Sequence, residues 1–387
     1  MGVGELWVAQ VSAISVPRGR DEAASRGVDP GGRLRFRVLD AGSRADVTAW
    51  LEAWRRWPER EVMAHPEYAR LFARPDERVV AVLAEAEGGA VLFPLVLRPI
   101  AAEPWAAPGE DRWDATTPYG YGGPFAWGER EGHGPAFWQA YEAWCRDERV
   151  VCTFARLSLF PDQLAPLKGK VEVRGPNVVV PLQGGIDAVW RGYDRDVRRR
   201  LRVARREGVT VELDRDGARV AEFHEIYAHT MERRRAPAWY RFPCAFFERL
   251  VRLLPGQFLL VHALAGGRVL SSELVLASAR HVYAFLGGTR SDGFHVYPNE
   301  VVRHAAAEWA AADGKAGYVL GGGRSAEDGI YRHKRLLAPK GEVPFRTACL
   351  VHDELAYHAL ARRRDAWEAS SGTRWTPLPG FFPAYRG

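Results

Sequence analysis

At 387 residues, 47% hydrophobic and 26% charged, the chain has the size and composition of a globular protein with two domains. No apolar run approaches the ~20 residues that span a bilayer, and the N-terminus lacks a basic head followed by an apolar core, so we expect a cytoplasmic protein. The four cysteines show no paired motif, which argues against a zinc site or a disulfide framework, and the net charge of +6 permits an anionic partner.

The first half of the chain predicts a loose leader followed by a small mixed domain. Residues 1–34 show no hydrophobic periodicity. Helical spacing of tryptophans and leucines predicts a helix over 47–57, and a second short helix follows Pro66. Two apolar strands joined at Gly88-Gly89 predict a hairpin over 79–97. A glycine-rich and tyrosine-rich loop over 116–128, a helix over 135–146 and a strand over 151–157 complete this half.

The second half repeats this order. Helices are predicted over 193–207, 220–235 and 245–254, followed by a three-strand meander over 258–264, 269–277 and 281–286. A helix over 299–312 and a strand beginning at Tyr318 end the series. The repeat predicts an α+β protein with two similar domains, 35–186 and 187–340, whose seam lies near 181–189. Residues 341–387 are expected to return and pack on the first domain.

The order of helices, meander, helix and strand resembles the layout of acyl-CoA N-acyltransferases of the GNAT type. The resemblance implies a Gly-rich loop before a helix, whose backbone N–H groups cradle a pyrophosphate. The corresponding stretch here is 287–300. It departs from the expected spacing because Gly293 is followed by the bulky run from Phe294 to Tyr297.

The helix predicted over 193–207 has a basic side and an apolar side. Arg195, Arg198, Arg199, Arg202, Arg205 and Arg206 recur at helical spacing, opposite Val197, Leu201 and Ala204. Such a face can bind phosphates, and the alternative is a solvated helix surface. Trp239 and Tyr240 follow three further arginines, an arrangement that suits nucleotide or RNA contacts and equally suits loop packing.

The stretch from Tyr318 to Gly341 combines a short buried strand, three glycines, an acidic turn and a basic aromatic segment carrying Lys334. The glycines allow backbone to approach another group closely. One interpretation is a site that holds the Lys334 cation. The other is a tight connection with solvent-facing Arg and Lys.

Five motifs together resemble the Fem family of aminoacyl-tRNA-dependent peptidyl- and aminoacyltransferases, a branch of the GNAT superfamily with two GNAT-like domains. They are RRRLRVARREGVTVE, MERRRAPAWYRFPCAFFERL, YPNEVVRHAAAEWAAADG, YVLGGG and DGIYRHKRLL. The resemblance covers about 60–345 and is strongest over 193–337. It implies two tandem GNAT-like domains with a cleft between them, aminoacyl-tRNA as donor in place of acyl-CoA, an amine acceptor, and no resident cofactor or metal.

The resemblance also assigns site residues. The family's oxyanion-stabilising lysine matches Lys334, and the arginine that grips the acceptor's diphosphate matches Arg198 to within one residue. The family's N-terminal basic residue has no clear counterpart, so the acceptor need not be a peptidoglycan nucleotide. The expected substrate-binding set is Arg198, Arg199, Arg202, Tyr119, Tyr121, Trp239, Tyr240, Tyr283, Asn299 and Tyr331.

The function that we expect is transfer of an amino acid from aminoacyl-tRNA to an amine of a peptide-like or nucleotide-linked acceptor, in cell-wall or natural-product biosynthesis. No nucleophilic triad stands out, so we expect direct amine attack with Lys334 as the electrostatic stabiliser. Glu327 or Asp328 is a weaker candidate for positioning the amine. The alternatives are an acyl-CoA-dependent N-acyltransferase acting on a sugar or peptide amine, and a pair of GNAT-like domains that only binds a nucleotide or RNA.

Overall fold

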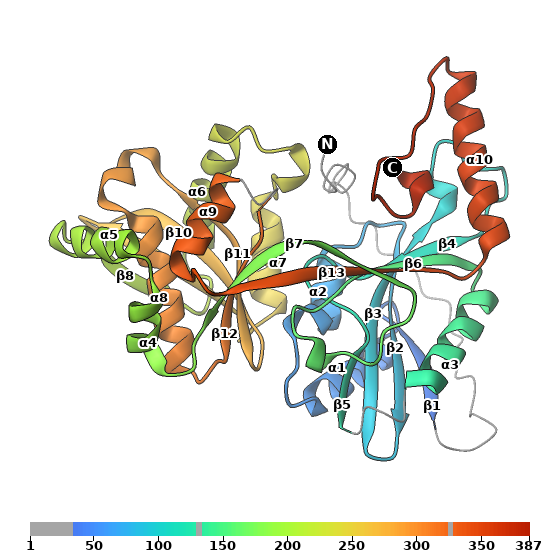
Figure 1. The fold of residues 1–387 in the computed structure, drawn as a ribbon, viewed down its shortest axis with the longest axis horizontal. Coiled ribbons are helices and arrows are strands. Elements are labelled where there is room, and N and C mark those ends of the chain that lie inside the picture. Colours follow the sequence, from blue (N-terminus) through green and yellow to red (C-terminus); the bar gives the residue numbers. More distant parts are fainter. Residues whose placement is uncertain (1–33, 129–133, 324–327) are drawn as a thin grey trace. The chain divides into compact units, whose positions relative to one another are not determined.

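The structure is a computed structural model and describes residues 34–128, 134–323 and 328–387. These residues form two compact units that interleave along the chain (Figure 1). The first unit comprises residues 34–58, 63–174 and 346–387, and the second comprises 59–62 and 175–345. The predicted leader lies outside the described residues except for its last residue. The sequence predicts a domain boundary near 181–189, whereas the two units divide within one strand, between residues 174 and 175.

The first unit contains a mixed sheet flanked by helices. Its elements are β1 (Arg35–Asp40), α1 (Arg44–Arg56), α2 (Pro66–Leu71), β2 (Arg78–Ala86), β3 (Gly89–Pro99), η2 (Ile100–Ala102), β4 (Trp113–Thr116), β5 (Phe125–Gly128), α3 (Gly134–Asp147), β6 (Val150–Arg156), η3 (Pro161–Gln163), β13 (Glu342–Val351), α10 (Glu354–Ser370) and η6 (Ala384–Arg386). Its strand order is β1-β2-β3-β4-β6-β13, with β5 paired to β3. Gly88 has a φ of 83° and makes the predicted hairpin turn between β2 and β3.

Most pairings in this sheet are antiparallel, but β4 and β6 are parallel. The core beneath the sheet contains Trp50 of α1 and Phe137 of α3, both fully buried. The last described residues pack in a separate hydrophobic cluster of this unit, which contains Tyr385. The Arg386 side chain donates from Nε to the buried carboxylate of Asp114 at 2.5 Å, and Asp114 also accepts from Arg98 Nε at 2.6 Å.

The second unit contains the remaining strands. Its elements are β7 (Lys170–Pro181), α4 (Gly185–Gly192), α5 (Arg195–Arg206), β8 (Thr210–Asp214), α6 (Val220–Arg233), η4 (Ala238–Tyr240), α7 (Cys244–Leu253), β9 (Phe258–Ala265), β10 (Arg268–Ala277), β11 (His281–Thr289), η5 (Ser291–Val296), α8 (Pro298–Ala312), β12 (Gly317–Gly321) and α9 (Gly329–Leu337). Its strand order is β7-β12-β11-β10-β9-β8. The segment 59–62, which runs into η1 (Val62–Ala64), belongs to this unit through hydrogen bonds to β11.

Helices cover both faces of these strands. Because successive strand residues point to opposite faces, neighbouring residues of one strand pack against different helices. Ala263 of β9 packs in the cluster that contains α8, α4 and α5, whereas its neighbour Leu264 packs with Ile226 of α6. The parallel pair among these strands is β11 with β12. The strands and helices define an α+β protein, as predicted.

Several elements were not predicted as such. The basic aromatic segment that carries Lys334, for which no helix was predicted, is the helix α9, and the Asp328 carboxylate caps it by accepting the Ile330 N–H at 2.9 Å. Strands β7 and β13 each contain a proline, which removes a ladder donor and weakens the strand signal. In the described part of the chain, no helix is long and apolar enough to cross a membrane.

Candidate functional site in the second unit

The candidate site lies where the parallel strands β11 and β12 end. Parallel strands present their carboxyl ends at one edge of a sheet, which is where ligands bind in many α/β folds. Gly321 leaves β12 with a φ of 77°, and a Cβ on Gly322 would lie 2.9 Å from the Pro176 carbonyl oxygen. Glycine at these two positions therefore lets the backbone turn and pass close to β7.

Lys334 reaches this turn from α9. Its Nζ donates a hydrogen bond to the Gly322 carbonyl oxygen at 2.6 Å. Burial and, to a smaller extent, the positive charge of Arg303 lower the pKa of Lys334 to about 7, while Glu273 and Asp328 act in the opposite direction. Near neutral pH the side chain is therefore divided between ammonium and amine. The Lys334 Nζ lies at the carboxyl edge of β12, beside Gly322.

Arg303 and Glu273, from two other elements, form an ion pair that acts on the charge of Lys334. Arg303 of α8 pairs with Glu273 of β10 at 3.4 Å, and Glu273 also accepts a hydrogen bond from the Tyr318 hydroxyl at 2.6 Å. The Nε and one terminal nitrogen of Arg303 are buried without a hydrogen-bond partner among the described residues. Arg303 therefore contributes a positive charge that its own contacts satisfy only in part.

His333 is next to Lys334 and is neutral. Asn299 Nδ2 donates to His333 Nε2 at 3.0 Å, which places the imidazole proton on Nδ1. Burial, together with the positive charges of Arg303, Arg200 and Lys334, lowers the pKa of His333 to about 4. A neutral imidazole packed among cations suits a structural or hydrogen-bonding role near neutral pH.

Arg200 brings α5 to the same cluster. Its guanidinium pairs with the buried Glu300 carboxylate of α8 at 2.8 Å and lies 5.7 Å from the Tyr297 ring centroid. Sequence reasoning did not select Arg200, Arg303, Glu273 or Glu300. Arg200 carries a signal that could have found it, since it lies one helical turn from the buried Val197 and Ala204, at the border of the apolar face.

The three arginines chosen from α5 have other contacts. Arg198 donates to the backbone carbonyls of Arg191 and Tyr193, at the end of α4. Arg199 is exposed and pairs with Asp196 at 3.5 Å. Arg202 is exposed, with its guanidinium 5.8 Å from the Trp190 ring centroid. Their predicted role in gripping an acceptor stays a prediction.

The exposed arginines of α5 nevertheless form a continuous basic surface. We call it the basic face, and it consists of Arg195, Arg199, Arg202, Arg205 and Arg206. The helix carries seven arginines against one aspartate. It packs beside the Lys334 site, because the Asp194 N–H donates to the Leu336 carbonyl of α9 at 2.8 Å and Arg200 pairs with α8.

The remaining predicted residues of this unit have contacts of their own. The Tyr331 hydroxyl donates to Glu342, and the ring is buried. The Tyr283 hydroxyl donates to Glu61 at 2.7 Å and so holds the segment 59–62. Trp239 and Tyr240 lie in η4, where their rings contact each other. Asn299 contacts His333, the residue that precedes Lys334.

Tyr119 and Tyr121 belong to the first unit. The Tyr119 carbonyl accepts from the Tyr68 hydroxyl at 2.9 Å, and its ring stacks on Phe72. Burial raises the pKa of both predicted tyrosines, so both are protonated near neutral pH. Of the weaker candidates, Asp328 caps α9 and Glu327 lies outside the described residues.

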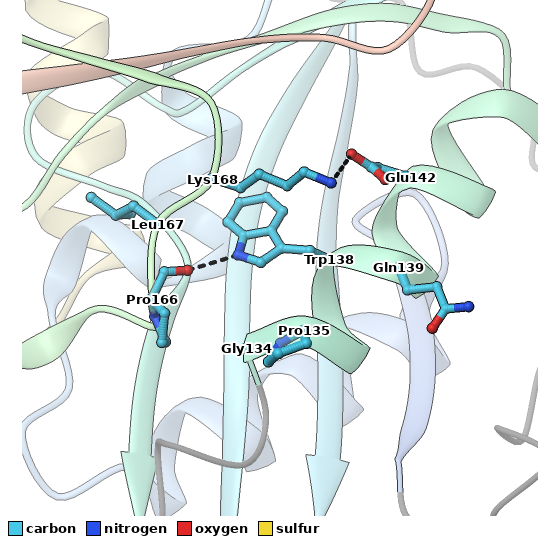
Figure 2. Close-up of a pocket in the computed structure, with 8 residues that line it drawn as sticks. All are labelled: Gly134, Pro135, Trp138, Gln139, Glu142, Pro166, Leu167 and Lys168. Atoms are coloured by element: carbon cyan, nitrogen blue, oxygen red, sulfur yellow. Dashed lines mark hydrogen bonds and ion pairs between the residues drawn. The ribbon is translucent and has the colours of Figure 1, made fainter.

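The first unit also has a surface pocket of about 410 Å³ beside α3 (Figure 2). Trp138 donates its indole N–H to the Pro166 carbonyl at 2.7 Å, and Lys168 pairs with Glu142 at 2.5 Å. These groups are already paired with one another, and none of the predicted site residues lines the pocket. Within the described residues, no group of three or more His, Cys, Asp or Glu side chains could hold a metal ion.

Comparison with known proteins supports the fold. Residues 191–335, which include the Lys334 site, match the family described as acetyltransferase (GNAT) domain. A search of curated proteins finds no match to this chain. The predicted GNAT-type fold is therefore confirmed for the part of the chain that carries the site.

Two solved structures resemble most of the chain. The crystal structure of FemX has a TM-score of 0.62 at 12% identity, covering 81% of this chain and 98% of that one. A conserved protein of unknown function from Bacteroides thetaiotaomicron has a TM-score of 0.52 at 10% identity, covering 82% of this chain and 99% of that one. At these identities the likeness is one of fold, and it agrees with the Fem-like resemblance found in the sequence.

Proposed function

We propose that the protein is an aminoacyltransferase that moves the amino acid of an aminoacyl-tRNA to the amine of a peptide-like or nucleotide-linked acceptor. The observation that carries the proposal is the basic face of α5, which packs against the helices of the Lys334 site. Among the described residues, Arg195, Arg202, Arg205 and Arg206 make no ion pair with a carboxylate, so they remain able to contact phosphates. A donor with a long phosphate backbone suits such a surface, and the proposal includes a cytoplasmic setting.

The chemistry needs a neutral amine, a positioned ester carbonyl and a cation near the developing oxyanion. The amine nitrogen attacks the carbonyl carbon of the aminoacyl ester, a C–N bond forms, and negative charge develops on the carbonyl oxygen. The Lys334 ammonium stabilises that charge. When the C–O bond breaks, the ribose hydroxyl of the tRNA leaves with the proton that the amine loses, so no covalent enzyme intermediate is needed.

The alternative is transfer from acyl-CoA, which the match to an acetyltransferase family favours. The start of α8 weighs against it, because this is where a GNAT pyrophosphate would be bound. Pro298 occupies the first helical turn and lacks an N–H, and the Glu300 carboxylate adds negative charge to the same turn. Tyr297, with a φ of 54°, precedes them in place of a glycine. This helix terminus is thus a poor receptor for a dianionic pyrophosphate.

The test supplies radiolabelled aminoacyl-tRNAs and acyl-CoAs in separate reactions with a panel of amines. We expect label to reach an amine from aminoacyl-tRNA, and we expect Lys334→Met to abolish most of that transfer. Arg363→Met, on the exposed side of α10 in the first unit, removes an equal charge elsewhere and serves as the matched control. Transfer from acyl-CoA alone would replace the proposal with its alternative.

A further inference from the structure

A second buried cation occupies the corresponding place in the first unit. Strands β4 and β6 are parallel, so Thr116 and Arg156 lie at the same edge of their sheet. The loop that follows β4 is held beside Arg156 by three hydrogen bonds. Gly122 N–H donates to the Arg156 carbonyl at 2.9 Å, Ser158 N–H donates to the Gly122 carbonyl at 2.7 Å, and Arg156 N–H donates to Thr117 Oγ1 at 3.0 Å.

Among the residues that the structure describes, the Arg156 guanidinium has no counter-charge. It forms no ion pair with any carboxylate of the described residues, and one of its terminal nitrogens is buried without a hydrogen-bond partner there. Its carbon lies 5.4 Å from the Phe154 ring centroid. Arg98, the neighbouring arginine, is by contrast paired with Asp114 at 2.5 Å. Burial lowers the pKa of Arg156, and the positive charge of Arg98 adds to that effect.

A buried and unpaired guanidinium destabilises a fold, so its presence needs a reason beyond packing. Tyr119 and Tyr68 interact electrostatically with Arg156, and Tyr121 interacts with Tyr119. As whole residues, Arg156, Tyr119 and Tyr121 are each partly exposed. The Arg156 guanidinium thus offers an unpaired positive charge and a planar set of N–H donors beside the Phe154 ring.

We propose that Arg156 is the anchor of a carboxylate-binding subsite in the first unit, which takes the carboxylate of the amine-bearing acceptor. A single guanidinium matches a carboxylate in charge, whereas a phosphate dianion would leave a negative charge buried. The fork of N–H donors also matches the two carboxylate oxygens in geometry. The acceptor is thus an amino acid or a peptide with a free carboxylate. This identification of the acceptor rests on the proposed function, while the binding of a carboxylate does not.

The experiment measures thermal unfolding of the full chain with acetate, inorganic phosphate or chloride at equal ionic strength. We expect acetate at up to about 100 mM to raise Tm saturably by ~2–4 °C over chloride. In Arg156→Met this rise should vanish, and in chloride the variant should be more stable than the wild type, because a buried unpaired charge is gone. Arg156→Lys keeps the charge without the fork, so it should retain a smaller acetate response. Arg146→Met removes an exposed charge at the end of α3 and should respond like the wild type.

Three results would overturn the subsite. They are an acetate response that survives in Arg156→Met, a larger response to phosphate than to acetate in the wild type, and a loss of stability in chloride for Arg156→Met. A separate measurement compares KM for alanine with KM for alaninamide as acceptors, and Arg156→Met should raise only the former. If no amine is aminoacylated yet the acetate response depends on Arg156, the subsite stands and the proposed function fails.

Discussion

The ionisation of Lys334 gives the sharpest test of its role as the oxyanion-stabilising cation. With a pKa of about 7, the ammonium fraction falls from about 0.9 at pH 6 to about 0.1 at pH 8. If the rate of the chemical step follows the ammonium form, this contribution drops about tenfold per pH unit above 7. The acceptor amine complicates a simple profile, because it must itself lose a proton and so gains reactivity over the same range.

A ratio between two enzymes removes that complication. Lys334→Arg carries a guanidinium that stays charged at every pH in the range, and it acts on the same amine. Its absolute activity will differ, but amine ionisation cancels when wild-type kcat/KM is divided by that of the variant. We expect the ratio to be constant below pH 6 and to fall about tenfold between pH 7.5 and 8.5.

Single-turnover rates at saturating donor are the measurement of choice, because they separate chemistry from product release. Lys334→Met sets the baseline without a cation and should reduce the rate by ~10²–10³-fold near pH 6.5. A ratio that stays flat from pH 6 to 9 would refute the reasoning. It would mean either that Lys334 remains charged throughout or that its charge does not act on the transition state.

Three further predictions concern stability and donor binding. In urea unfolding, Lys334→Met should be more stable than the wild type near pH 6. This advantage should shrink as the pH rises from about 7 towards ~10.4. Over that range the unfolded wild-type chain binds a proton that the folded chain has lost, because the pKa of Lys334 is lower in the folded state. Burial lowers the pKa of His352, which forms a hydrogen bond with Thr153, to about 4. The free energy of unfolding should therefore fall by roughly 2 kcal/mol between pH 7 and pH 5, and His352→Gln should lessen that fall. Changing four arginines of the basic face to Gln should reduce the slope of log affinity for aminoacyl-tRNA against log salt by roughly 2–4, and an unchanged slope would remove α5 from the donor site.

The sequence was informative about elements with strong periodicity. The helix α5 was predicted because Val197, Leu201 and Ala204 recur at helical spacing, and all three are buried. The hairpin of β2 and β3 was predicted from its glycine pair. The strands β7 and β13 were not, because their place in a sheet depends on partners far away in the chain, such as β12 and β6. The short helix α9 has too few residues to signal itself without its tertiary contacts.

For the candidate site, too, local features could be predicted from the sequence and contacts between distant segments could not. A local motif was enough to select Lys334 as a candidate. Its charged surroundings come from β10, α8 and α5, and no local pattern joins Glu273, Arg303 and Arg200. Arg200 was also hidden among seven arginines that look alike in sequence, and only the burial of one helix face distinguishes it. Arg156 gave no signal, because an unpaired charge is defined by what surrounds it in space.

The interleaving of the two units affects how the protein can be made. The edge of β6 is paired by β13, and the buried Asp114 receives Arg386 from the very last turn of the chain. A ribosome therefore releases all of residues 175–345 before the first unit can acquire these partners. The second unit, by contrast, is nearly continuous and can fold while synthesis proceeds. We expect newly made chains to pass through a stage in which one unit is folded and the other still exposes a strand edge to aggregation.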